Sequence, residues 1–428
     1  MTLSRAAFAP CLFVTTFLGS IANPERVFAD WPQWRGPNRD DISTETGLLK
    51  DWPKEGPKQL WMNEDCGLGY SGPAIVGTTL YTLAARGAEE LLLAIDVKSG
   101  EEIWAKPFGE VLGNNWGDGP RSTPTVDGDL IYALGAKGDL VCVRAVSGDV
   151  VWSKSLLDLG GKIPTWGYSE SPLIYKDTVV CTPGGEQGAI AAFNKATGEI
   201  VWQSTDLTSG AHYSSIVVAN RGGGGECVQL LPDQLVGVAA DTGKTLWTHP
   251  WPTPTAAIPT PIVSGNFVYA TSGYGVGCML VEVGPDFAVE QRYENKVMKN
   301  KHGGVILVGD HLYGYSDDIG WVCQEFSTGE RVWRDRQALE MGAVAYADGM
   351  LYCIGQKEGQ VVLIEASPEG WKEHGRFQLN PLSDQRKPEG GIWTHPVICD
   401  GKLYLRDQNL LFCFDIRESS VATADAGN

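Results

Sequence analysis

The segment TPTVDGDLIYALGAKGDLVCVRAVSGDVVW, residues 123–152, decides the fold of this chain. Short runs of β-branched and aromatic residues alternate in it with the turn sequences Asp-Gly, Lys-Gly-Asp and Ser-Gly. Such runs between glycine-containing turns are typical of short antiparallel strands. The segment therefore predicts a small sheet of four strands that ends at Trp152.

The end of this segment recurs along the chain at intervals of 40 to 50 residues. Its copies are SGEEIW (99–104), SGDVVW (147–152), TGEIVW (197–202), TGKTLW (242–247) and TGERVW (328–333). A second marker is a proline seven residues before an aliphatic residue, and with its degenerate copies it defines eight units. Four strands in each unit of this length predict an all-β, eight-bladed β-propeller. We expect the closing tryptophans to pack between neighbouring blades, because their rings bury a large apolar area.

The ends of the repeat region suggest how the ring closes. The last unit has no closing tryptophan strand, whereas an unassigned strand, PKQLW (57–61), precedes the first unit. Pairing this N-terminal strand with the last blade would remove a free sheet edge. We therefore assign residues 57–417 to the propeller, 30–56 to an N-terminal extension and 418–428 to a disordered polar tail. The glycine-rich run at 220–225 predicts a flexible loop.

Residues 1–29 are typical of a secretory signal peptide, with Arg5 before an apolar stretch and small residues before a cut after Ala29. A cut after Ala22 is the alternative. The apolar stretch is too short to predict a membrane span. We expect a periplasmic or extracellular monomer. The net charge of −18 disfavours nucleic acid and anionic lipid as partners.

The ten cysteines do not resemble a disulfide framework, because they include no adjacent pair and no Cys-x-x-Cys. Several recur at equivalent strand positions, so we expect buried, unpaired thiols. These are Cys142, Cys181, Cys323, Cys353 and Cys413.

The repeat also predicts a site, because the segment before each innermost strand opens onto the central channel at one face. Aromatic and charged residues gather there, whereas core positions repeat apolar types. The candidates are Tyr70, Trp116, Arg121, Tyr168, Glu170, His212, Tyr213, Lys301, His302, Trp393 and His395. Convergent polar and aromatic groups in a concave mouth form a small-ligand site. The alternative is that they hydrogen-bond the water of the channel.

Individual candidates carry their own alternatives. Glu170 could bind Ca²⁺ or act as a base, but we expect a salt bridge to Arg121 of the neighbouring blade. His212 and His302 could bind a metal, although a hydrogen-bonded channel histidine is commoner. We expect the WPQWRG segment (31–36) to pack on the outside of the barrel as a tether for the closing strand. An exposed recognition patch is the alternative there.

The repeat resembles the PQQ-type β-propeller repeat, which occurs in pyrroloquinoline-quinone alcohol dehydrogenases and in the outer-membrane assembly protein BamB. AFNKATG (192–198), AADTGK (239–244) and the opening DWPQWRGPNRDDIS (30–43) carry the resemblance. Those dehydrogenases have adjacent cysteines over the quinone and a Ca²⁺ site, and fused members have a haem motif. This chain has neither Cys-Cys nor CxxCH.

The resemblance together with these departures predicts a non-catalytic binding or scaffold protein. Its partner would be another exported protein or a small ligand at the channel mouth. The alternative is a PQQ-dependent dehydrogenase with PQQ and Ca²⁺ as cofactors.

Overall fold

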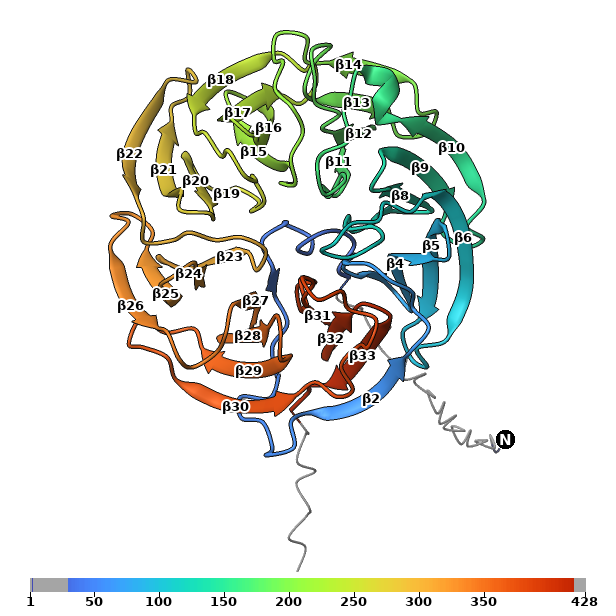
Figure 1. Cartoon of the computed structure of the whole chain (residues 1–428), viewed down its shortest axis with the longest axis vertical. Coiled ribbons are helices and arrows are strands. Elements are labelled where there is room, and N and C mark those ends of the chain that lie inside the picture. The colour runs from blue at the N-terminus through green and yellow to red at the C-terminus, as the bar shows by residue number, and fades with distance from the viewer. Residues whose placement is uncertain (1, 3–29, 419–428) are drawn as a thin grey trace, which may run out of the picture.

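Eight sheets stand in a ring around a central channel in the computed structural model, which describes residues 30–418 and residue 2 (Figure 1). Each sheet is one blade, in which the strands follow one another from the channel to the outer edge. The eight-bladed propeller predicted from the repeat is confirmed. The expected signal peptide and all but the first residue of the expected tail lie outside the described residues.

The first four blades follow one another in chain order. Blade 1 contains β3 (Ala74–Val76), β4 (Thr79–Arg86), β5 (Glu89–Asp96) and β6 (Glu102–Glu110). Blade 2 contains β7 (Thr125–Asp127), β8 (Leu130–Leu134), β9 (Asp139–Arg144) and β10 (Val150–Ser155), followed by the 3-10 turn η1 (Leu156–Leu159). Blade 3 contains β11 (Leu173–Tyr175), β12 (Thr178–Cys181), β13 (Ala191–Asn194) and β14 (Ile200–Gln203). Blade 4 contains β15 (Val217–Arg221), β16 (Gly224–Leu230), β17 (Gln234–Ala239) and β18 (Thr245–Pro250).

The last four blades complete the ring. Blade 5 contains β19 (Ile262–Ser264), β20 (Phe267–Ser272), β21 (Gly277–Val283) and β22 (Val289–Asn295). Blade 6 contains β23 (Val305–Val308), β24 (His311–Ser316), β25 (Gly320–Glu325) and β26 (Arg331–Asp335). Blade 7 contains β27 (Gly342–Ala347), β28 (Met350–Gly355), β29 (Gln360–Glu365) and β30 (Glu373–Gln378). Blade 8 contains β31 (Val397–Cys399), β32 (Lys402–Asp407), β33 (Leu410–Asp415) and, from the N-terminal side, β2 (Lys58–Asn63).

The pairing of β2 with β33 closes the ring, as the unassigned N-terminal strand predicts. The two strands are antiparallel, with Lys58 opposite Asp415 and Trp61 opposite Cys413. Blade 8 therefore takes its outer strand from one end of the propeller sequence and its other three strands from the opposite end. This arrangement leaves no blade without its fourth strand.

The joints between blades explain why the repeat keeps its glycine and its tryptophan. Gly198 in blade 3 has a φ of +71°, and a Cβ there would lie 2.7 Å from the indole of Trp152 in blade 2. Only glycine adopts this conformation readily and leaves room for the ring. The same pair recurs as Trp61 with Gly100, Trp104 with Gly148 and Trp202 with Gly243. The predicted packing of tryptophan between blades is confirmed at these joints.

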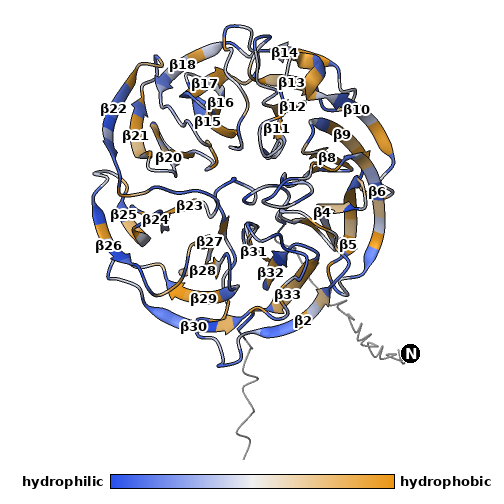
Figure 2. Cartoon of the chain, in the orientation of Figure 1, coloured by the Kyte–Doolittle hydropathy of each residue, from blue (hydrophilic) through white to orange (hydrophobic). Residues whose placement is uncertain are grey.

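The core lies between the blades, in clusters that join apolar residues of two neighbouring blades. Figure 2 shows hydrophobic residues in the inner and middle strands, whereas an outer strand such as β22 is mostly hydrophilic. All nine cysteines of the described residues are buried in this core, and the five at equivalent strand positions are free thiols, as the strand pattern predicts. The glycine-rich run at 220–225 does not form the expected loop. It is the turn of the β15–β16 hairpin, with Arg221 opposite Gly224. Gly222 and Gly223 supply the positive φ that the turn requires.

The N-terminal extension does not pack on the outside of the barrel, so that prediction is wrong. Residues 31–43, here called the plug, cross the middle of the ring (Figure 1). Trp31 begins the crossing with a β-bridge to Ile75 of blade 1. At the other end β1 (Ile42–Ser43) pairs in parallel with β27 of blade 7.

Two buried arginines fix the plug between these points. Arg39 donates to the carbonyl oxygens of Ile216 at 2.6 Å and Pro172 at 2.6 Å, in blades 4 and 3. Arg35 donates to the carbonyl oxygen of Val305 in blade 6 at 2.6 Å. The inner ends of the blades leave backbone carbonyls that point into the channel, and guanidinium groups satisfy several of them at once. The extension is therefore part of the core.

Among the described residues, no helix has the length and the apolar character that a membrane crossing requires.

Candidate ligand site at the channel mouth

A cavity of about 140 Å³ lies at the axis of the ring above the plug. Its wall comes from the segments that precede the innermost strands of several blades, and its floor includes Trp34 and Arg35 of the plug. The lining residues are Trp34, Arg35, Tyr70, Trp116, Arg121, Trp166, Ser169, Tyr213, Ser215, Ile258, Pro259, Thr260, Tyr274, His302, Gly304, Trp393 and His395. Aromatic rings dominate this lining, with few polar groups among them, which is the usual composition of a small-ligand site.

Stacked rings form one wall of the cavity. Trp393 stacks on Tyr70 with ring centroids 4.7 Å apart and on His302 with centroids 4.5 Å apart. The three residues come from the entries of blades 8, 1 and 6, so the stack joins segments that are distant in sequence. Such contacts stabilise a fixed arrangement of flat surfaces.

Arg121 lies against this wall. Its guanidinium carbon is 5.3 Å from the centroid of the Tyr70 ring, and its nitrogens donate to the carbonyl oxygens of Gly117 and Gly119. No carboxylate of the described residues lies within ion-pair distance of it. Burial lowers the pKa of Arg121, yet an arginine stays protonated at neutral pH. The wall therefore carries a positive charge without a paired anion.

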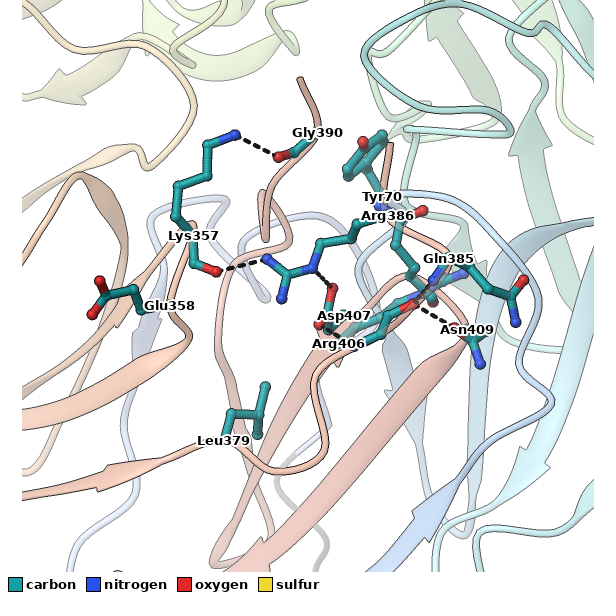
Figure 3. A network of polar contacts seen from close by, with 12 residues as sticks. Tyr70, Lys357, Glu358, Leu379, Gln385, Arg386, Gly390, Arg406, Asp407 and Asn409 are labelled. Carbon is teal, nitrogen blue, oxygen red and sulfur yellow. Dashed lines mark hydrogen bonds and ion pairs between the residues drawn. The ribbon is translucent and has the colours of Figure 1, made fainter. Parts of the chain in front are cut away.

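Two rim loops, residues 112–119 and 380–391, border this side of the mouth. Lys387 joins them through an ion pair with Asp118, with Nζ 2.7 Å from Oδ1. Arg386 fixes the second loop to blades 8 and 7, because it bonds to Asp407 of blade 8 at 3.1 Å and to the carbonyl oxygen of Lys357 of blade 7 at 2.7 Å (Figure 3). Lys357 in turn donates to the carbonyl oxygen of Gly390 at 2.8 Å. The rim is thus tied in place by polar contacts.

The opposite side of the mouth is more open. Lys301 Nζ lies 4.6 Å from the centroid of the Tyr274 ring and 3.2 Å from Asp317. Tyr274 is 42% exposed, and Trp116 across the mouth is 41% exposed. The rim of the mouth therefore carries an exposed aromatic ring on each of two sides.

The floor of the mouth contains a buried ionic cluster. Asp41 of the plug lies 2.6 Å from Arg35 and 2.9 Å from His395 Nδ1. His395 Nε2 donates to the carbonyl oxygen of His302 at 2.8 Å. Arg35 and the hydrogen-bonded His395 lower the pKa of Asp41 despite its burial, which alone would raise it. The cluster ties the plug to the entries of blades 6 and 8.

The structure brings most of the predicted site residues together. Those that line the cavity are Tyr70, Trp116, Arg121, Tyr213, His302, Trp393 and His395. Lys301 lies at the rim. His212, Tyr168 and Glu170 lie outside the lining, and each has a local partner instead.

The expected salt bridge between Glu170 and Arg121 is not present, so that prediction is wrong. Glu170 is 2% exposed and accepts hydrogen bonds from the backbone and the hydroxyl of Thr182. Burial raises its pKa to about 7. Tyr168 donates to the carbonyl oxygen of Pro183 at 2.9 Å, also away from the cavity. Both side chains are therefore held by the residues that directly follow β12 in blade 3.

The two histidines considered as metal ligands have separate partners. His212 stacks on Tyr213 and accepts a hydrogen bond from the backbone of Ala257 at 3.1 Å, whereas His302 stacks on Trp393. Within residues 30–418, no three His, Cys, Asp or Glu side chains gather where they could hold a metal ion.

Trp34, Trp166 and Tyr274 line the cavity but were absent from the predicted set. Trp166 and Trp116 share a signal that could have identified both, because each is followed by glycine at the entry of its blade. Trp34 belongs to the plug, which has no counterpart in the repeat. Its indole donates to the hydroxyl of Thr260 at 3.0 Å.

Comparison with known proteins gives a family match over more than half of the chain. The family model described as outer membrane protein assembly factor BamB matches residues 88–335. The chain is 24% identical over 336 residues to outer membrane protein assembly factor BamB of Shewanella oneidensis, which covers 74% of this chain and 77% of the relative.

Solved structures share the fold at lower identity. BamB from Moraxella catarrhalis is 15% identical, with a TM-score of 0.60 over 83% of this chain and 97% of that one. Quinohemoprotein alcohol dehydrogenase from Comamonas testosteroni is 12% identical, with a TM-score of 0.62 over 91% of this chain and 80% of that one. At such identities the likeness shows the fold alone.

Proposed function

This chain belongs to the family described as outer membrane protein assembly factor BamB, and from that premise we propose that it is a non-catalytic binding propeller. Its partner is another exported protein, which engages the channel mouth. The composition of the mouth carries the proposal. Core positions of the blades repeat apolar types, whereas the mouth presents the exposed rings of Trp116 and Tyr274 beside the cations Arg121 and Lys301.

The same proposal includes a location outside the cytoplasm. The sequence of residues 1–29 supports export, and the name of the relatives associates them with assembly of outer membrane proteins. An exported partner would meet the mouth there. The partner contacts would be aromatic and cationic, since tryptophan, tyrosine and arginine dominate binding energy at protein interfaces.

A quinoprotein dehydrogenase is the second candidate, because that class shares the fold. A PQQ site with Ca²⁺ needs oxygen ligands from carboxylates and amides. The described lining of the cavity contains no Asp, Glu, Asn or Gln. The nearby carboxylates Asp41, Asp118 and Asp317 are each paired with a cation. These residues do not fit the calcium site, so we derive no catalytic step through the quinone.

Site-specific photo-crosslinking in cells tests the binding role. A photoreactive benzoylphenylalanine replaces Trp116 at the mouth or, as a control, Val150 on the outer strand β10, which is 57% exposed. We expect a discrete adduct with one exported polypeptide from position 116 and none from position 150. An adduct pattern that is the same at both positions would contradict the proposal.

The enzyme alternative has its own assay. The purified protein is incubated with PQQ and Ca²⁺, and alcohol-dependent dye reduction is followed. We expect no turnover. Turnover that disappears in the Arg121→Ala variant would replace the binding role with a dehydrogenase.

A further inference from the structure

The cavity at the mouth is closed at its inner end. The plug crosses the channel below it, and Trp34 and Arg35 form the floor while Trp31, Arg39 and Asp41 are at most 4% exposed. An occupant can therefore enter only from the mouth, and it must be a small molecule or the end of a chain.

The size of the cavity limits the occupant to one ring. Its volume of about 140 Å³ is close to that of an apolar cavity of about 150 Å³ that binds benzene. The flat faces of Tyr213 and Trp166, whose centroids are 5.4 Å apart, and the Tyr70–Trp393 stack offer aromatic surfaces on different sides. Aromatic rings prefer such offset and edge contacts with other rings.

The positive charge on the wall of the cavity favours a ligand that carries an anionic group. Arg121 uses two of its five N–H donors on Gly117 and Gly119, and no described carboxylate pairs with it. A half-buried guanidinium without a counter-ion is unfavourable, so an incoming carboxylate gains a charge-assisted hydrogen bond.

A second observation at the same cavity supports this choice. His302 Nδ1 is buried and has no hydrogen-bond partner. Burial, together with the positive charges of Lys301 and Arg121, lowers the pKa of His302 to about 3. The ring is therefore neutral at pH 7, and one of its nitrogens is available as a donor in a positive environment.

We infer that the cavity binds a single aromatic ring that carries a carboxylate, with the ring among the aromatic walls and the carboxylate on Arg121. The inference rests on the proposed binding role of the mouth and names the group that enters it. Two sources share this chemistry: a free aryl-alkanoic acid and the C-terminal aromatic residue of a polypeptide.

Calorimetric titration of the purified protein tests the inference with matched probes. N-acetylphenylalanine presents both groups, N-acetylphenylalanine amide lacks the carboxylate, and N-acetylcyclohexylalanine lacks the aromatic ring. We expect the acid to bind at least about tenfold more tightly than the amide, since one charge-assisted hydrogen bond contributes a factor of this size. It should also bind more tightly than the cyclohexyl analogue, which cannot make edge and offset contacts with the aromatic walls. 3-Phenylpropionate and the tripeptide Ala-Ala-Phe then distinguish the two sources by which of them binds more tightly.

Variants of Arg121 test whether this residue causes the preference for the acid over the amide. In Arg121→Gln the ratio of acid to amide affinity should fall to about one, and in Arg121→Lys it should be partly kept. Lys176→Gln is the control, because Lys176 also lies over a tyrosine ring but far from the mouth on the surface. The ratio is measured within each variant, so a general loss of folded protein does not change it.

Equal affinity for acid and amide in the unaltered protein would overturn the inference, as would a preference that survives in Arg121→Gln. Neither result affects the crosslink from position 116, which reports the binding role alone. A lost crosslink together with an intact acid preference would instead remove the protein partner and keep the small-ligand site.

Discussion

The blade joints and the channel mouth use the same residue type for different purposes. At the joints tryptophan is buried against a glycine of the next blade, as Trp152 is against Gly198. At the mouth Trp116 is 41% exposed and lies outside the repeated Gly-x-x-x-Trp segment. The comparison indicates that the repeat encodes stability, whereas the departures from the repeat lie at the mouth that we propose to bind a partner.

The same substitution in the two regions gives the largest expected contrast. Trp152→Ala should lower the free energy of unfolding by about 3 to 5 kcal/mol, because it leaves a cavity between two blades. Trp116→Ala should lower it by less than about 1 kcal/mol, since the side chain is largely solvated. Urea denaturation of both variants measures the difference. Equal losses would mean that the mouth is a structural joint as well.

The plug extends the comparison to a region with no repeat. Asp41→Asn removes the anion between Arg35 and His395, and both ion-pair partners are almost fully buried. We expect a loss of about 3 kcal/mol or more in unfolding free energy, because a buried cation is left without its partner. Asp241→Asn breaks an exposed pair with Lys176 and should cost less than about 1 kcal/mol. A small effect of Asp41→Asn would show that the plug is not part of the core.

Glu170 predicts a pH dependence that the joints do not share. Its pKa is raised to about 7, above the unfolded value near 4.5, so the folded state favours the protonated form. Stability should therefore fall as the pH rises above 4.5 and level off above 7, by about 3 kcal/mol in all. Glu170→Gln should reduce this decline in denaturation curves taken from pH 5 to 8.5 and leave the contribution of Glu90, whose pKa burial also raises to about 7. An unchanged decline would assign it to other groups. Exposed Glu199→Gln is the control.

The smallest expected change in stability concerns the glycines at the joints between blades. Gly198→Ala and Gly128→Ala share a positive φ, but only Gly198 would bring a Cβ against an indole, whereas Gly128 has open space. We expect about 1 kcal/mol for Gly128→Ala from the backbone alone and about 2 kcal/mol for Gly198→Ala. Thermal melting resolves the difference. Equal effects would mean that the close contact with Trp152 is not important.

The sequence predicted the structural features that recur from blade to blade. Periodic glycine and tryptophan located the joints, and symmetry brought Tyr70, Arg121 and Trp393 to one face, because equivalent positions of a ring share a height along its axis. The missing eighth outer strand predicted the closure by β2 in the same way. These successes depend on geometry that eight copies have in common.

The sequence could not predict features that occur once. The plug has no second copy, so neither its crossing of the channel nor the presence of Trp34 in the cavity followed from periodicity. The partner of Glu170 also could not be predicted, because it depends on the direction of a single side chain. In the structure this side chain is buried in blade 3 and accepts hydrogen bonds from Thr182. The glycine-rich hairpin at 220–225 was read as a loop because glycine is poor in strands, although here it serves the turn.

One measurement tests most directly the claim that the residues of the mouth contribute little to stability and are available for binding. The crosslink from position 116 is repeated in a protein that also carries Arg121→Gln, which breaks no ion pair among the described residues, and its melting temperature is recorded alongside. The account predicts that the adduct is lost while the melting temperature stays within about 4 °C of the unaltered protein. An adduct of unchanged yield, or a large fall in the melting temperature, would contradict it.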